Sequence, residues 1–179
     1  MRVITGKCRG RRLLEPAGRD VRPTTDQVKE AMFNIIQFQV EGARVLDLFA
    51  GTGQLGIEAL SRGAESCTFV DAARDSVHLV EENLRRCGLT GRVLCCDALS
   101  FLKTGEKFDL VFLDLPYGSG LDGKAMESLK EFDILSKGGI MICETRADTD
   151  LPELSPSYGT VRTYRYGKIK LTVVTRSGD

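Results

Sequence analysis

A short apolar run that breaks into a glycine-rich turn and resumes as a helix restricts this chain to few folds. Residues 45–49 (Val-Leu-Asp-Leu-Phe) have the β-branched and aromatic content of a buried strand. Gly51, Gly53 and Gly56 follow, and glycine permits positive φ and a close approach of the backbone to a ligand. A strand, a glycine turn and a helix in this order are typical of nucleotide-binding folds. We therefore expect a nucleotide-like ligand at this turn.

Acidic residues lie close to this turn and at the ends of two further predicted strands. Asp71 ends the strand over residues 67–71, where such folds bind a ribose diol, because a carboxylate accepts two hydroxyl hydrogen bonds at once. Asp47 precedes the glycines and Asp97 follows a strand over 92–96. Acids here would repel a pyrophosphate but suit a ligand with an ammonium and a sulfonium group. We expect S-adenosylmethionine, with an NAD-dependent oxidoreductase as the alternative.

The rest of the chain alternates between strand and helix patterns. Further strands are predicted at 108–113 and 138–144, and helices at 55–62, from 74 to 88, at 98–102 and at 123–135. Residues 158–166 and 168–175, around a glycine, alternate like an antiparallel hairpin. Repeated strand-helix units of this length predict an α/β fold with a doubly wound, mostly parallel sheet and a ligand crevice at the carboxyl ends of its strands.

The N-terminal residues form a local cluster of positive charge in a chain whose net charge is zero. Residues 1–15 predict a hairpin whose arms are 2–5 and 12–15 and whose tip is basic. The cations are Arg2, Lys7, Arg9, Arg11 and Arg12. They suggest a clamp for RNA phosphates, with Gly6 and Gly10 letting the tip follow a nucleic-acid backbone. The alternative is an ordinary solvated turn.

Length and composition indicate one domain, residues 1–179, in which 1–20 form a basic N-terminal extension. No apolar run approaches the ~20 residues of a membrane helix, and the N-terminus lacks the apolar core of a signal peptide. We expect a cytoplasmic monomer that contacts no membrane. With one histidine, His78, and six cysteines without a C-x-x-C pair, we expect buried reduced thiols and no metal site.

A helix start is predicted just before residue 26. Thr24 or Thr25 can cap it, Gln27 fits the capping-box position behind Thr24, and Val28 begins its apolar face. This first turn is also close enough to the predicted crevice to contact the methionine part of a cofactor. Thr24 and Thr25 therefore have two interpretations, helix cap and cofactor contact.

The strand over 108–113 ends in Asp114-Leu115-Pro116-Tyr117. Together with the turn from Asp47 to Gly53, this motif resembles the class I S-adenosylmethionine-dependent methyltransferases that modify exocyclic amines of nucleobases. The whole chain resembles the RsmD family, bacterial guanine-N2 methyltransferases of 16S ribosomal RNA. The supporting segments are the basic opening at 6–11, Arg-Pro-Thr-Thr-Asp at 22–26, Leu-Ser-Arg-Gly-Ala at 60–64, the strand at 108–114, and Tyr-Gly at 166–167.

The resemblance implies a Rossmann-like methyltransferase fold and a role for each motif. Asp114 and the carbonyl of Leu115 would accept hydrogen bonds from the target amine, Pro116 would stiffen the turn, and Tyr117 would stack on the base. The expected cofactor-binding residues are Asp47, Phe49, Ala50, Gly51, Thr52, Gly53, Asp71, Ala72, Asp97 and Ala98, with Thr24 and Thr25. The expected substrate is guanine-966 of 16S rRNA, in naked RNA or in an assembling small ribosomal subunit.

Two features leave alternatives open. The family has two prolines after the catalytic acid, whereas this chain has Leu115 before Pro116, so a catalytically weak RNA-binding assembly factor is one alternative. An acid-x-Pro-Tyr turn also suits adenine N6 or cytosine N4 as the target amine.

For Asp97 a helix cap is the structural alternative to contact with the adenine amine.

Overall fold

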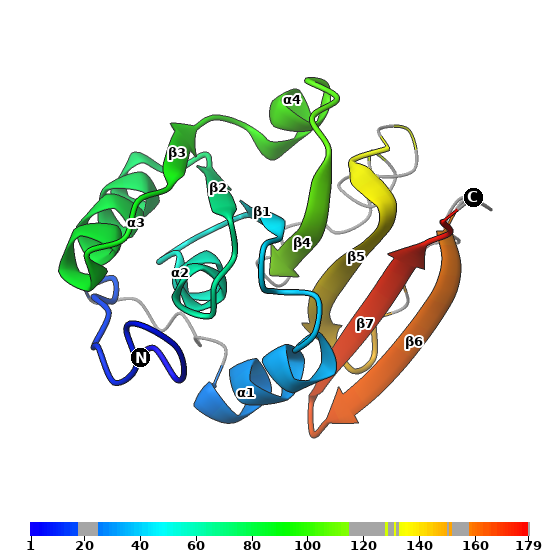
Figure 1. Cartoon of the computed structure of the whole chain (residues 1–179), viewed down its shortest axis with the longest axis horizontal. Helices are drawn as coiled ribbons and strands as arrows, with labels where there is room; N and C mark the ends of the chain where they lie inside the picture. The colour runs from blue at the N-terminus through cyan, green and yellow to red at the C-terminus, as the bar shows by residue number, and fades with distance from the viewer. Residues whose placement is uncertain are drawn as a thin grey trace.

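The seven strands form one sheet in the order β3-β2-β1-β4-β5-β7-β6 (Figure 1). This computed structural model describes residues 1–17, 25–114, 128, 131, 133–149, 151 and 158–178. The strands are β1 (Arg44–Leu48), β2 (Ser66–Asp71), β3 (Arg92–Cys95), β4 (Phe108–Asp114), β5 (Leu135–Arg146), β6 (Tyr158–Tyr166) and β7 (Ile169–Arg176). β1 to β5 pair in parallel, and β7 runs antiparallel to both β5 and β6. The predicted doubly wound sheet with a C-terminal antiparallel hairpin is confirmed.

The direction of strand addition reverses at β1. The chain adds β2 and β3 on one side of β1, then crosses to its other side for β4 and β5. In open α/β sheets the ligand crevice forms at this switch point, outside the carboxyl ends of the two central strands. The topology therefore points to the space beyond the ends of β1 and β4.

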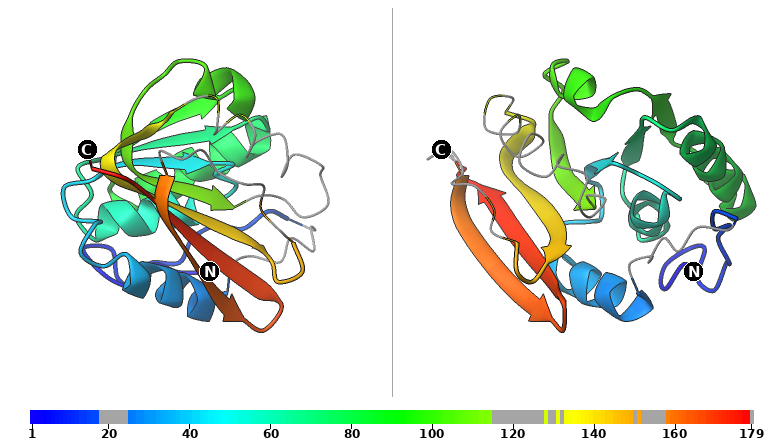
Figure 2. Two further views of the ribbon diagram at one scale, coloured as in Figure 1. Left: turned by 90° about the vertical axis from the view of Figure 1, so that its right-hand side faces the viewer. Right: turned by 180° about the vertical axis from the view of Figure 1, so that it is seen from behind.

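Helices cover both faces of the sheet (Figure 2). The helices are α1 (Asp26–Ile35), α2 (Gln54–Ser61), α3 (Arg74–Cys87) and α4 (Ala98–Leu102). Side chains of α1, α2 and α3 join one apolar cluster with one face of the sheet, and α4 joins the cluster on the other face. On the first face, the Phe33 ring of α1 lies 5.4 Å from the Phe112 ring of β4. Among the described residues, no helix is long and apolar enough to cross a membrane.

Most predicted elements are found close to their expected limits. The inward residues of α3 are Val77, Val80, Leu84 and Cys87, and Gly88 ends it in a left-handed conformation, as predicted. The helix expected over 123–135 falls mostly outside the described residues. Its predicted end at Leu135 is wrong, because Leu135 is the first residue of β5. The N-terminal cap of α1 is Thr25, whose hydroxyl accepts from the Val28 amide at 3.3 Å. Of the two predicted caps, Thr25 is therefore the one observed.

The N-terminal segment folds back on itself as predicted, but through one antiparallel bridge, Arg2 to Arg12, rather than two full strands. It is docked along α2 and α3 instead of being an independent hairpin (Figures 1 and 2). Gly6 shows why: a Cβ there would lie 1.9 Å from the carbonyl oxygen of Ser61. The lack of a side chain at Gly6 therefore serves packing against α2, and its role in adapting the tip to RNA stays a prediction.

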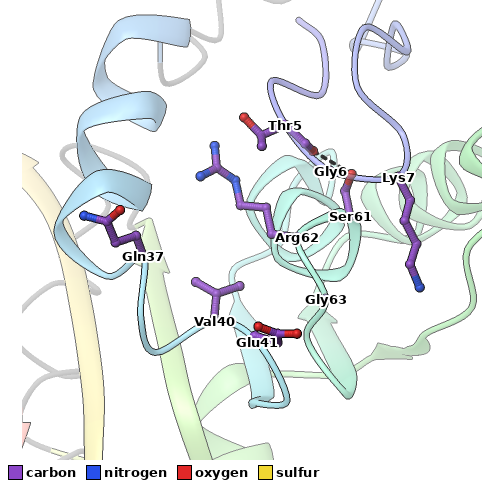
Figure 3. A pocket seen from close by; sticks show the side chains of 9 residues that line it. All are labelled: Thr5, Gly6, Lys7, Gln37, Val40, Glu41, Ser61, Arg62 and Gly63. Carbon is purple, nitrogen blue, oxygen red and sulfur yellow. Dashed lines mark hydrogen bonds between the residues drawn. The ribbon is translucent and has the colours of Figure 1, made fainter.

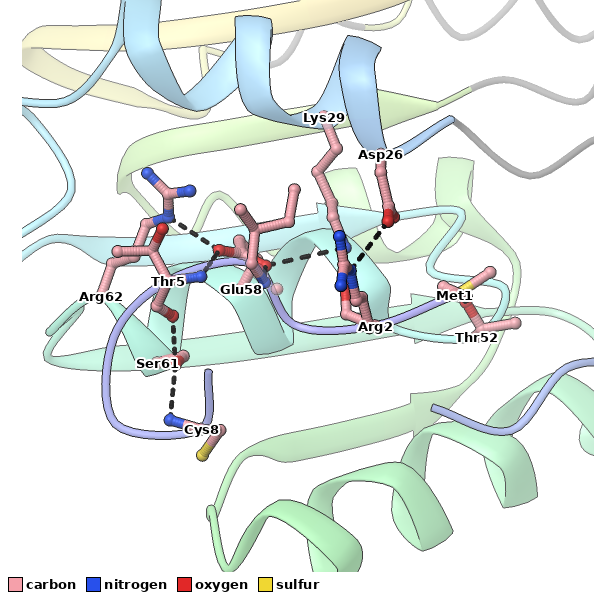
Figure 4. Close-up of polar contacts among 12 residues, drawn as sticks. Met1, Arg2, Thr5, Cys8, Asp26, Lys29, Thr52, Glu58, Ser61 and Arg62 are labelled. Carbon is pink, nitrogen blue, oxygen red and sulfur yellow. Dashed lines mark hydrogen bonds and ion pairs between the residues drawn. The ribbon is translucent and has the colours of Figure 1, made fainter. Parts of the chain in front are cut away.

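A buried carboxylate, Glu58 of α2, fastens this segment (Figure 4). Its oxygens accept from the amides of Ile4 at 2.8 Å and Thr5 at 3.0 Å. The same carboxylate pairs with Lys29 of α1 at 3.6 Å and with Arg62 at 2.8 Å. The side chains of Glu58 and Lys29 are both fully buried, and burial lowers the pKa of Lys29 while Glu58 opposes that shift. One acid thus joins the N-terminal segment, α1 and α2.

We expect Glu58→Gln to destabilise the protein by about 3–5 kcal/mol, because it leaves the buried Lys29 ammonium without a counter-charge. Urea unfolding measures this loss. Glu82→Gln is the control: Glu82 also pairs with two arginines, but on the exposed side of α3, and should cost less than about 1 kcal/mol. Equal effects of the two variants would contradict the role given to Glu58.

Candidate active site

The glycine turn between β1 and α2 adopts the conformation that its sequence predicts. Gly51 and Gly53 have φ of 58° and 76°, which only glycine adopts at little cost. Phe49 has φ of 66° without being glycine, and such strained residues cluster at functional sites. Gly56 has a different function from the one expected: its missing side chain lets α2 approach Phe69, since a Cβ would lie 2.3 Å from that ring.

Asp71 connects the turns that follow β1 and β2. One carboxylate oxygen accepts from the Gly51 amide and the other from the Ala73 amide, both at 2.9 Å. A carboxylate has about four lone-pair positions, so these two bonds orient the group and leave acceptor capacity. Asp71 is half-buried at the carboxyl end of β2. This geometry suits a ribose diol approaching from the crevice.

Asp47 is a strongly perturbed acid of the site. It is 1 % exposed, and its Oδ2 accepts from the Gly56 amide at 2.9 Å. Burial raises its pKa to about 8, with further repulsion from Asp114 and Asp71 and opposition from the Gly56 hydrogen bond. Three carboxylates thus act on one small volume. A cationic ligand would relieve their repulsion, so these residues fit the ammonium and sulfonium groups of S-adenosylmethionine.

Asp114 ends β4, and Glu144 of β5 is directly beside it in the parallel register. Asp114 is half-buried and Glu144 is 3 % exposed. Glu144 lies inside the sheet, since β5 lies between β4 and β7. The sequence signal that could have found Glu144 is the same as for Asp114, an apolar strand that ends in an acid.

Asp97 forms a helix cap, which was the structural alternative predicted for it. It caps α4: Oδ2 accepts from the Ser100 amide at 3.0 Å. The side chain is exposed beyond the end of β3, so the cap and a contact with an adenine amine are compatible.

The remaining predicted residues divide into three groups. Thr52 contacts Met1, its hydroxyl donating to the Met1 sulfur at 3.3 Å, and Thr25 serves as the helix cap. Ala50 and Ala98 are buried, and Ala72 is exposed in the turn after β2. Thr24, Leu115, Pro116 and Tyr117 lie outside the described residues.

The predicted RNA-binding cations lie along one segment whose base is next to the glycine turn. Lys7, Arg9, Arg11 and Arg12 are exposed, and within the described part of the chain none of them forms an ion pair. Arg2 differs, because its guanidinium pairs with Asp26 at 3.1 Å. Asn83 ties the segment to the site: its amide donates to the carbonyl oxygens of Leu14 at 3.2 Å and Thr52 at 2.9 Å.

A second hollow, of 440 Å³, lies at the far end of α2 from the glycine turn (Figure 3). Its lining includes Lys7, Arg62 and Glu41. The α2 helix separates it from the crevice, and it contains none of the predicted cofactor residues. It is therefore distinct from the expected cofactor site, and it lies next to the basic tip and away from Asp114.

Comparison with known proteins shows that the chain is similar to ribosomal RNA methyltransferases. It is 39% identical to "Putative rRNA methyltransferase YlbH" of Bacillus subtilis, over 99% of this chain and 100% of that protein. It is 32% identical to "Ribosomal RNA small subunit methyltransferase D" of Escherichia coli, over 100% of this chain and 91% of that protein. The solved structure "Putative methyltransferase yhhF from Escherichia coli" superimposes with a TM-score of 0.89 at 30% identity, covering 100% of this chain and 99% of that one.

The sheet order, the acid-lined crevice and these relatives define a class I methyltransferase that uses S-adenosylmethionine. Residues 1–175 match the family described as "Conserved hypothetical protein 95". The chain belongs to this family, the RsmD family.

We expect Asp47→Asn to flatten the pH dependence of stability in the absence of cofactor. The folded pKa of Asp47, about 8, exceeds the ordinary aspartate pKa of about 4, so its contribution to stability is fully present below about pH 4 and lost as pH rises through about 8. Asparagine does not titrate, so unfolding in urea from pH 4 to 9 should show a smaller loss for the variant.

Asp148→Asn is the control of opposite sign. A hydrogen bond from Arg146 lowers the pKa of Asp148, so that acid contributes above its unfolded pKa and its contribution is lost as pH falls. Its replacement removes stability near neutral pH. A curve for Asp47→Asn that parallels the wild type would contradict the burial of an uncompensated carboxyl.

Proposed function

We propose that the protein transfers a methyl group from S-adenosylmethionine to the exocyclic N2 of a guanine in 16S rRNA. The observation that carries this proposal is Asp114 at the end of β4, close enough to Asp47 to raise the pKa of that acid. The small-subunit rRNA methyltransferases among its relatives support the substrate class. By resemblance the target is guanine-966.

The cofactor would bind across the ends of β1 and β2. In this placement Asp71 accepts from the ribose hydroxyls, Asp47 faces the methionine ammonium, and Asp97 receives the adenine amine. The backbone around Gly51 and Gly53 allows close approach to the ligand. The methyl group would then point across the switch point, toward the carboxyl end of β4.

The target amine needs help because its lone pair is conjugated with the guanine ring. Two acceptors, the Asp114 carboxylate and the Leu115 carbonyl, would bind its two hydrogens and direct the lone pair at the methyl carbon. Much of the acceleration then comes from alignment of nitrogen, carbon and sulfur. A nitrogen–carbon bond forms as the carbon–sulfur bond breaks, and Asp114 stabilises the positive charge that develops on nitrogen.

Proton removal follows methyl transfer in this scheme. Once methylated, the nitrogen carries a positive charge and becomes acidic, so it can release its proton to water and no strong base is required at the start. Tyr117 would hold the extruded base by stacking, since a base must leave its stacked surroundings to reach the crevice. Product release then returns S-adenosylhomocysteine and methylated RNA.

RNA phosphates would bind along the N-terminal segment. Lys7, Arg9, Arg11 and Arg12 are exposed and have no acidic partner within the described residues, so their charge remains available to a polyanion. The base of this segment contacts the glycine turn through Thr52. A strand of RNA on the segment would therefore run toward the crevice.

Asp114→Asn should lower single-turnover methyl transfer to small-subunit RNA at least a hundredfold, because the developing charge loses its carboxylate partner. Titration calorimetry should show nearly unchanged binding of S-adenosylmethionine. Glu106→Gln is the matched control, an acid near the opposite end of β4 that pairs with Arg92. Retained turnover by Asp114→Asn would remove Asp114 from the mechanism.

Methylation tests should include guanine, adenine and cytosine as targets. Mapping the labelled position distinguishes guanine N2 from adenine N6 or cytosine N4. Absence of transfer by the wild type to any RNA or subunit preparation would favour an assembly factor instead.

Replacing Arg9, Arg11 and Arg12 with alanine should weaken RNA binding and reduce the slope of log affinity against log salt by about 2 to 3, since each phosphate contact contributes about 0.7 to 0.9. The control removes the same charge from Arg162, Arg165 and Lys168, which are exposed around β6 at the far edge of the sheet. If both triple variants lose equal affinity, the N-terminal segment has no specific role.

A further inference from the structure

Gln54 is a buried polar residue whose side-chain oxygen has no hydrogen-bond donor among the described residues. It is the first residue of α2, directly after Gly53, and is 6 % exposed. Its Oε1 is buried and accepts no hydrogen bond from any residue that the structure describes. A buried acceptor without a donor costs folding free energy, and such costs persist where a ligand supplies the missing partner. No sequence motif had drawn attention to this side chain.

The direction of the side chain can be derived from its place on the helix. Residues four apart share one helix face, so Gln54 lies on the face of Glu58, which meets Lys29 of α1 and the N-terminal segment. Helical side chains lean toward the helix N-terminus, which here is the glycine turn. Gln54 is therefore buried between the first turns of α1 and α2, at the rim of the crevice.

The surrounding charges indicate what kind of group would donate to Oε1. Asp47 also lies at this end of α2, where its Oδ2 accepts from the Gly56 amide. An ammonium group has three donors and no acceptor, so one carboxylate cannot satisfy it. A second buried acceptor at the same end of α2 would accept another of its hydrogens.

We propose that the side-chain carbonyl of Gln54 accepts a hydrogen bond from the α-ammonium of S-adenosylmethionine and so positions the methionine part of the cofactor. This inference rests on the cofactor placement proposed above. Gln54 is a positioning residue: it does not touch the methyl group, and it sets where the sulfonium lies relative to Asp114.

The decisive variant is Gln54→Met, which keeps an unbranched side chain of similar length and removes the acceptor. A purely structural glutamine and a ligand-binding glutamine predict opposite results for the protein without cofactor. Because Oε1 has no partner to lose, we expect the denaturation midpoint of this form to be unchanged or raised. Affinity for S-adenosylhomocysteine, measured by calorimetry, should fall about ten- to a hundredfold.

Two analogues identify the group that Gln54 binds. S-adenosylhomocysteine without its amino group should bind wild type and Gln54→Met equally, whereas the analogue without its carboxylate should retain the full difference between them. Gln37→Met, an exposed glutamine beside the second hollow, is the control and should bind both like the wild type.

Three results would overturn the inference while leaving the cofactor site intact. They are unchanged S-adenosylhomocysteine affinity in Gln54→Met, a difference that depends on the carboxylate instead of the amine, and a clear loss of stability without cofactor. Failure of the wild type to bind S-adenosylhomocysteine at all would instead remove the cofactor placement on which the inference depends.

Discussion

The burial of one carboxyl group beside two others, at the carboxyl ends of parallel strands, is the constraint on which the site depends. Asp47, Asp71 and Asp114 come from three neighbouring strands and are brought together because parallel strands end on the same side. Asp47 is buried, and this burial, with repulsion from the other two acids, raises its pKa to about 8. Near neutral pH the carboxyl group therefore largely keeps its proton, and a cationic cofactor would favour its ionised form.

The apolar periodicity of the chain was sufficient to predict most of the fold. Strands that end in an acid and helices that end in glycine have local signals, and α3 with Gly88 is the clearest case. The burial of Glu58 and Gln54 could not be predicted, because it depends on neighbours distant in sequence, as the contact of Glu58 with the N-terminal segment shows. A polar residue inside an apolar pattern shows only that something pairs with it.

Glycine illustrates the same limit. The residues Gly51 and Gly53 have the positive φ that a tight turn requires, and this requirement is visible in sequence. Gly6 and Gly56 are needed because another part of the chain approaches them closely, at Ser61 and Phe69. Sequence identifies both kinds as turn or ligand glycines, and only tertiary structure separates conformational need from packing.

Asn83 has a consequence for how the two substrates meet. Its one amide group bonds to Leu14 in the basic segment and to the Thr52 carbonyl in the glycine turn. Order in either element therefore limits the motion of the other. By linkage, any free energy by which RNA favours cofactor binding is returned in full when cofactor favours RNA. A single asparagine would thus couple the enzyme's two binding equilibria.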